Sequence, residues 1–147
     1  MNHISMILCA LALMFSSICA VAGETPQEAR HELMEGVKDA ASPIGKMLKG
    51  EKEFDAAVAM TSFEVWADAA ARFGDMFPAG SESGYDTEAR DTIWSDREGF
   101  DRALADFSAA VDAAITASPQ SLDALKPAAG PIFKQCKACH EGYRVED

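Results

Sequence analysis

Residues 136–140 read Cys-Lys-Ala-Cys-His, "CKACH", close to the C-terminus of the chain. Two cysteines three positions apart are compatible with four kinds of site: a disulfide, a redox-active dithiol, half of a zinc site or a haem attachment site. The C-x-x-C-H form favours haem. On a helix the two thiols lie on nearly one face, and the next residue projects an imidazole toward the iron.

The N-terminal segment indicates export. Residues 6–21 are almost wholly apolar, the first charged side chain is Glu24, and Ala20-Val21-Ala22 matches the small-x-small pattern read by signal peptidase. The apolar run is short for a membrane span. We therefore expect residues 1–22 to be a cleaved signal, with a retained N-terminal anchor as the alternative. Removal of this segment takes Cys9 and Cys19 with it and leaves one domain, residues 23–147.

The alternatives to haem fit the remaining sequence less well. A thioredoxin-type dithiol sits beside a βαβ pattern, which we do not find, and a disulfide within C-x-x-C closes too small a loop to stabilise much. Zinc needs a fourth ligand, and the only histidine left besides His140 is His31, at the edge of a polar helix face. We expect haem, with a haem-free helical thiol or disulfide protein as the alternative.

The net charge of the chain limits which binding partners it can have. The formal net charge of −11 falls entirely on residues 23–147. Nucleic acid and anionic membrane surfaces are therefore poor partners, and we expect no membrane insertion after signal cleavage. A redox protein with a basic patch is compatible. Acidic pairs such as Asp96 and Glu98 are interpreted as helix capping and solvated surface, and no feature suggests that the chain is an enzyme acting on an organic substrate.

The pattern of apolar residues predicts four helices and an all-α four-helix bundle. We expect the first helix to start in a capping box at Thr25–Glu28 and to end at Gly50, and the second to span about 55–73. The connection between the second and third helices is long, which suggests a crossover connection and not a tight turn. The third helix should open in a capping box at Ser95–Glu98 and end near residue 118. The fourth should begin near Ser121, with its main part from Pro131 to about residue 144, because Pro127 and Pro131 interrupt it.

Three stretches carry a family resemblance: "CKACHEGYR" at the end, "RHELM" in the first helix, and "FPAGSESGYDTEARDTIW" in the connection. They resemble the class II c-type cytochromes, which comprise cytochrome c prime and cytochrome c-556, over all of residues 23–147. The resemblance implies an antiparallel bundle with one covalent haem c near one end. It implies that Cys136 and Cys139 bind the haem, that His140 is the proximal iron ligand, and that Arg144 lies over the proximal side. It also leaves a homodimer through the first two helices open.

The resemblance places Met34 on the other side of the iron and Arg30 beside it. Periodicity also puts both on the inward stripe of the first helix, where a haem propionate would give Arg30 an anion. If the Met34 sulfur binds iron, the haem is six-coordinate, low-spin and suited to carrying one electron by Fe(II)/Fe(III) cycling. If Met34 only packs, the haem is five-coordinate and binds nitric oxide or carbon monoxide. We favour ligation. Trp66, Trp94 and Phe133 are interpreted as ordinary core.

Overall fold

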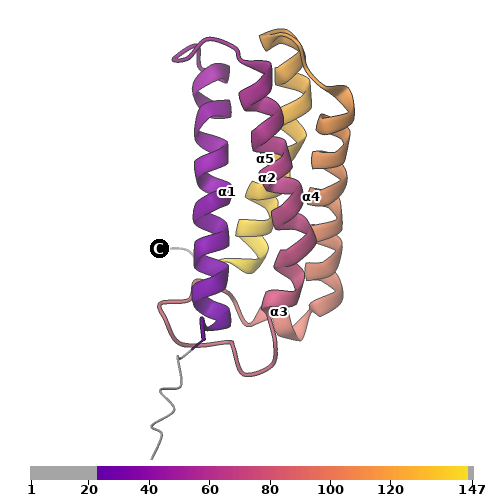
Figure 1. Cartoon of the computed structure of the whole chain (residues 1–147). Helices are drawn as coiled ribbons and strands as arrows, with labels where there is room; N and C mark the ends of the chain where they lie inside the picture. Colours follow the sequence, from indigo (N-terminus) through magenta and orange to yellow (C-terminus); the bar gives the residue numbers. More distant parts are fainter. Residues whose placement is uncertain (1–22, 146–147) are drawn as a thin grey trace, which may run out of the picture.

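The computed structural model describes residues 23–145, so the expected export signal at 1–22 lies outside the described residues. Four long helices form an antiparallel bundle (Figure 1): α1 (Pro26–Leu48), α2 (Ala56–Phe73), α4 (Arg97–Ala117) and α5 (Leu122–Tyr143). Two short elements, η1 (Gly74–Met76) and α3 (Thr92–Ser95), lie between α2 and α4. Within residues 23–145 the only β-type pairing is one isolated antiparallel bridge between Ala89 and Arg144. The expected all-α bundle is confirmed.

Most helix starts follow the local sequence. Thr25 and Glu28 form the expected capping box of α1, and Ser121 caps α5 by accepting from the amide of Ala124. The box expected at Ser95–Glu98 was wrong. Ser95 closes α3, and Asp96 is the N-cap of α4, accepting from the amide of Gly99 at 3.1 Å. Asp caps a helix as well as Ser does, so the local pattern allowed either residue.

The expected interruption of the last helix was also wrong, because α5 runs unbroken through Pro127 and Pro131. Both prolines are exposed. The carbonyls that lose an intrahelical donor there can therefore bond to water. Leu125, Ala129 and Ile132 on the opposite side are fully buried and fix the helix to the bundle. Burial of this apolar face outweighs the two missing backbone hydrogen bonds.

The core has two parts. The main part fills the bundle around Phe63 and Trp66, and the Trp66 indole donates to the carbonyl of Val37 at 3.0 Å, which fixes α2 to α1. Phe133 packs edge-on against Trp66. A second aromatic cluster lies at the end of the bundle where α2 ends and α4 begins. Its buried members are Phe77, Ile93 and Phe100, and Trp94 packs on it.

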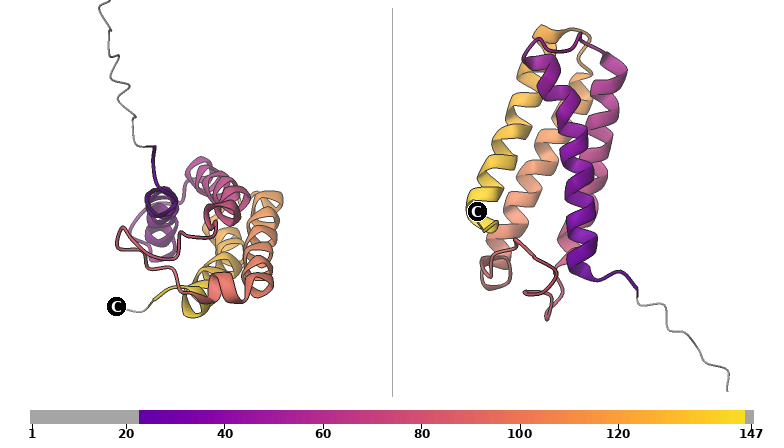
Figure 2. Two further views of the ribbon diagram at one scale, coloured as in Figure 1. Left: turned by 90° about the horizontal axis from the view of Figure 1, so that it is seen from below. Right: turned by 90° about the vertical axis from the view of Figure 1, so that its left-hand side faces the viewer.

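Residues 77–91, which we call the connecting loop, pass across this end of the bundle (Figure 2). The start of α1 and the end of α5 lie at the same end. The loop joins neighbouring helices, since α2 packs directly on α4, so the expected crossover is absent. The length of the loop instead allows it to contact both α1 and α5, and it thereby forms one wall of the site described next.

Candidate haem site

A cavity of about 450 Å³ lies at the loop end of the bundle. This volume falls in the range of pockets that hold a small molecule or cofactor. Its walls come from α1, the connecting loop, the second aromatic cluster and the last turn of α5. The residues that matter most to its chemistry are Arg30, His31, Met34, Glu88, Cys139, His140 and Arg144. Residues predicted from both ends of the chain therefore meet at one cavity.

The CKACH motif lies in the last turns of α5. Cys139 lines the cavity, whereas Cys136, one turn earlier, packs against the main core. Both thiols are free and half-buried. Burial raises the pKa of each thiol, and at Cys139 the neighbouring Cys136 raises it further. Reactive dithiols depend on a lowered thiol pKa, so these cysteines are poorly suited to a thiol switch.

His140 is suited to metal ligation. Partial burial lowers the pKa of its imidazole, and the charge of Arg144 lowers it further, against a smaller opposite effect of Glu88. Both effects favour the neutral ring, which keeps a lone pair for a metal. Among residues 23–145 no three His, Cys, Asp or Glu side chains gather to bind a bare metal ion. A single imidazole beside two cysteines of a C-x-x-C-H motif fits a haem iron.

Met34 faces the same cavity from α1. It is half-buried, and it lines the cavity from a different helix than the one that carries His140. A thioether and an imidazole from two helices form a common axial pair in cytochromes. His31, on the same helix, also lines the cavity but is exposed, with its ring edge-on to Tyr85 at 6.1 Å between centroids.

Arg30 is buried, with 5% of its surface exposed, and its guanidinium binds η1 and the connecting loop. It donates to the carbonyls of Met76 and Ser81, both at 2.9 Å, and to the hydroxyls of Ser81 and Thr87 at 3.0 and 3.1 Å. Burial lowers its pKa, which a more distant Glu82 partly offsets. Its hydrogen-bond partners in the structure are neutral. The sequence correctly placed Arg30 on the inward face, but it did not indicate this attachment to the loop.

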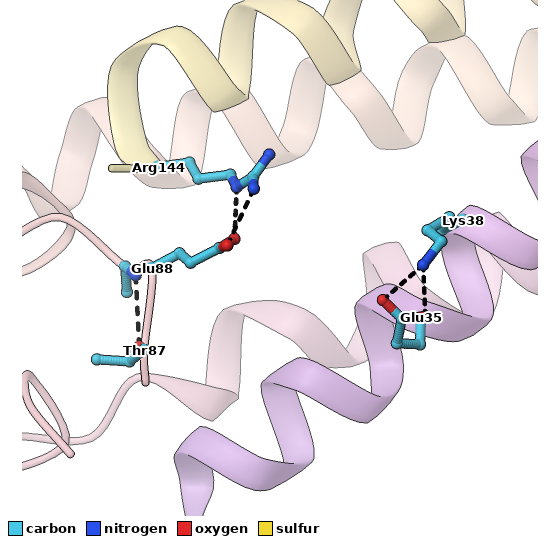
Figure 3. A network of polar contacts seen from close by, with 6 residues as sticks. Glu35, Lys38, Thr87, Glu88 and Arg144 are labelled. Carbon is cyan, nitrogen blue, oxygen red and sulfur yellow. Dashed lines mark hydrogen bonds and ion pairs between the residues drawn. The ribbon is translucent and has the colours of Figure 1, made fainter. Parts of the chain in front are cut away.

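Arg144 also binds the loop. It makes a two-pronged ion pair with Glu88, at 2.5 and 3.0 Å (Figure 3). Two backbone hydrogen bonds also join the loop to the end of α5. The amide of Val145 donates to the carbonyl of Glu88 at 2.8 Å, and the amide of Arg90 donates to the carbonyl of Tyr143 at 3.0 Å. Thr87, Glu88 and Tyr85, which also line the cavity, were not predicted from the sequence. They lie in an irregular loop, where no periodicity shows which way a side chain points.

The three large aromatic residues that were interpreted as core from the sequence do belong to the core. Trp66 and Phe133 pack in the main core and Trp94 in the second cluster. The aromatic residues on the cavity wall include Phe73, Phe77, Phe100 and Tyr143, which give it an apolar lining. None of the helices within residues 23–145 is long and apolar enough to cross a membrane.

A four-helix bundle with C-x-x-C-H on its last helix, beside a cavity that also receives a methionine, defines a c-type cytochrome of the bundle class. Residues 25–144 match the family described as "Cytochrome C'". The chain is 36% identical to a cytochrome c' of Rhodopseudomonas palustris over 80% of each chain, and 30% identical to a cytochrome c-556 of Agrobacterium fabrum over 92% of each. A solved structure of cytochrome c' from Rhodopseudomonas palustris superposes with a TM-score of 0.81, at 34% identity, over 85% of this chain and 99% of that one.

The chain therefore belongs to the cytochrome c' family. Its relatives, both cytochromes c' and cytochromes c-556, bind covalently attached haem c with iron. The cavity, the His140 imidazole and the two thiols of this chain fit that cofactor.

Proposed function

We propose that this chain is an exported monohaem cytochrome that carries single electrons. The observation that carries the proposal is that Met34 of α1 and His140 of α5 line one cavity together with Cys139. When bound, haem iron supplies a one-electron Fe(II)/Fe(III) couple. The chain's own residues attach, orient and shield that group, and no step requires turnover of an organic substrate.

Each residue has a separate role in this proposal. Cys136 and Cys139 would supply the two sulfurs that attach the haem, and His140 would supply a nitrogen ligand to its iron. Met34 would supply a sulfur ligand, which raises the reduction potential of a haem iron relative to ligation by histidine alone. Arg30 and Arg144 place two positive charges at the cavity wall, where carboxylates of a haem would be stabilised.

The five-coordinate form is the second candidate. Relatives of this chain include proteins named cytochrome c' as well as proteins named cytochrome c-556. If Met34 only packs at the cavity wall, the free position on the iron would bind nitric oxide or carbon monoxide. The two candidates share the fold, the attachment and His140, and they differ only in what Met34 does.

The test is the absorption spectrum of the protein produced with a haem-attachment system. A Soret band that stays with the denatured polypeptide after free haem has been extracted shows covalent haem, and its absence would overturn the cytochrome proposal. A low-spin oxidised spectrum at neutral pH that becomes high-spin in Met34→Leu shows ligation by the sulfur, because leucine preserves the packing. Met60→Leu, on α2 and packed against the main core, is the matched control. A high-spin wild-type spectrum would support the gas-binding candidate.

The setting is proposed on sequence grounds. Residues 1–22 would direct the chain to the periplasm and be removed, leaving residues 23–147 as the domain. The net charge of −11 favours a redox partner with a basic patch. A homodimer through α1 and α2 is a further proposal, which sedimentation of the haem-bearing protein can test.

A further inference from the structure

The two helices that carry the proposed iron ligands have little direct contact with each other. α1 packs mainly on α2, and α5 packs mainly on α4. The distance between Met34 and His140 therefore depends on the path through α2 and α4, and on whatever joins α1 to α5 at the cavity itself. The connecting loop is the segment that touches both.

On the α1 side, the loop is bound through Arg30, four residues before Met34. One of the acceptors of Arg30 is the Thr87 hydroxyl, at 3.1 Å. Residues four apart lie on the same face of a helix, so this bond acts one turn from the Met34 sulfur. Thr87 is half-buried, and its hydroxyl also accepts from the amide of Ala89 at 3.3 Å.

On the α5 side, the loop is bound through the next residue, Glu88. Its carboxylate holds Arg144, which follows His140 by four residues and whose amide donates to the carbonyl of His140 at 3.1 Å. The Glu88 carbonyl accepts from Val145 at 2.8 Å. Two adjacent loop residues therefore hold two arginines, each about one turn from a proposed iron ligand. We call this arrangement the Arg30–Arg144 bridge, and Figure 3 shows its α5 half.

We infer that Thr87 and Glu88 are positioning residues that set the separation of Met34 and His140, and with it the access of a sixth ligand to the iron. This inference rests on the proposed function. Loosening the bridge lets α1 move relative to α5, so that Met34 approaches the iron less closely. A small ligand from solution then competes better for the distal position. The direction of this effect is the same whether Met34 binds the iron or crowds it.

The test measures imidazole binding to the ferric, haem-bearing protein, together with its spin state. Thr87→Val keeps the shape of the side chain and removes the hydroxyl, and Glu88→Ala removes the ion pair. We expect each to tighten imidazole binding about fivefold, and the double variant by tenfold or more, as loss of one or two net hydrogen bonds implies. If the wild type is low-spin, its high-spin fraction should rise in the same order.

Two controls separate positioning from a general loss of stability. Thr87→Ser keeps the hydroxyl and should bind imidazole within about twofold of the wild type. Asp123→Ala removes an exposed partner of Lys126 at the start of α5 and should also have no effect. Circular dichroism should show the same helix content in every variant.

Three outcomes decide the inference. Tighter imidazole binding in the order given supports it. Wild-type affinity and spectra in Thr87→Val and Glu88→Ala, alongside a changed spectrum in Met34→Leu, would overturn the bridge and leave the proposed function intact. Absence of covalent haem from the wild type would overturn both.

Discussion

Replacement of Arg30 by methionine tests how the connecting loop is held to α1. Arg30 donates four hydrogen bonds, and its guanidinium carbon lies 4.7 Å from the centre of the Phe77 ring. Methionine is nearly as long but has no donor. The substitution therefore removes the polar contacts and keeps most of the volume.

The size of the expected stability loss depends on which hydrogen-bond acceptors are left without a donor when Arg30 is replaced. The hydroxyl of Ser81 still donates to Pro78, and that of Thr87 still accepts from Ala89, so the substitution orphans mainly the carbonyls of Met76 and Ser81. A buried acceptor without a partner costs about 1–3 kcal/mol, and the lost cation–π contact adds about 0.5–1 kcal/mol. Removal of the buried charge offsets part of this loss of stability. Burial lowers the Arg30 pKa, which means that the charged form is disfavoured in the folded state. We expect a net loss of about 3 kcal/mol in the free energy of unfolding, a large part of the ~5–15 kcal/mol typical of a domain.

The assay is urea unfolding of the haem-bearing protein, followed by circular dichroism. The urea concentration at the unfolding midpoint should fall. The slope of unfolding free energy against urea concentration should stay constant, because unfolding exposes nearly the same surface area as in the wild type. Arg72→Met is the matched control. Arg72 is exposed and pairs with Asp68 at 2.7 Å on α2, and its loss should change stability by less than about 0.5 kcal/mol. A loss below about 1 kcal/mol in Arg30→Met would show that desolvation of the buried charge cancels its hydrogen bonds and would refute this reasoning.

Three further predictions concern helix ends and the main core. Asp96→Ala removes the side chain that caps α4 and should lower the unfolding free energy by about 1 kcal/mol in the same urea assay. Phe63→Ala leaves a cavity at a fully buried position and should lower it by about 3–5 kcal/mol, whereas a loss under 1 kcal/mol would mean that the core closes around the gap. The third prediction concerns pH. Hydrogen bonds from the Thr25 backbone amide and side chain lower the Glu28 pKa, so its stabilising effect is present above the unfolded pKa and is lost as pH falls through the folded one. The stability difference between wild type and Glu28→Gln should therefore shrink from pH 7 toward pH 3, and a constant difference in melting temperature across that range would contradict it.

The helices and the haem motif were predictable because they are encoded locally. Apolar residues three and four apart predict helices, and the capping box at Thr25–Glu28 marks the start of α1 correctly. Errors arose where two local patterns competed. Ser95 and Asp96 were both acceptable caps, and the two prolines of α5 suggested a break that burial of the opposite face prevents.

The candidate site was predictable only in part. Met34 and His140 were each placed on an inward face, and both line the cavity. Glu88 and Thr87 were not identified as site residues. The arginines that they bind lie 56 and 57 residues away in the chain, respectively. Arg30 was recognised as a buried charge that needs partners, but nothing in its neighbourhood identified the loop oxygens that provide them.

The sequence by itself determined the C-x-x-C-H motif, the export signal as an expectation, the four amphipathic helices and the inward faces of Met34 and His140. All of these depend on spacings of a few residues. The tertiary structure decided that the two candidate ligands share one cavity, that α5 is continuous, and that Thr87 and Glu88 join α1 to α5 through two arginines. The physical reason is that helix periodicity fixes the direction of a side chain only relative to its own helix. The distance between two helices depends on contacts between residues far apart in the chain, and these exist only once the chain is folded.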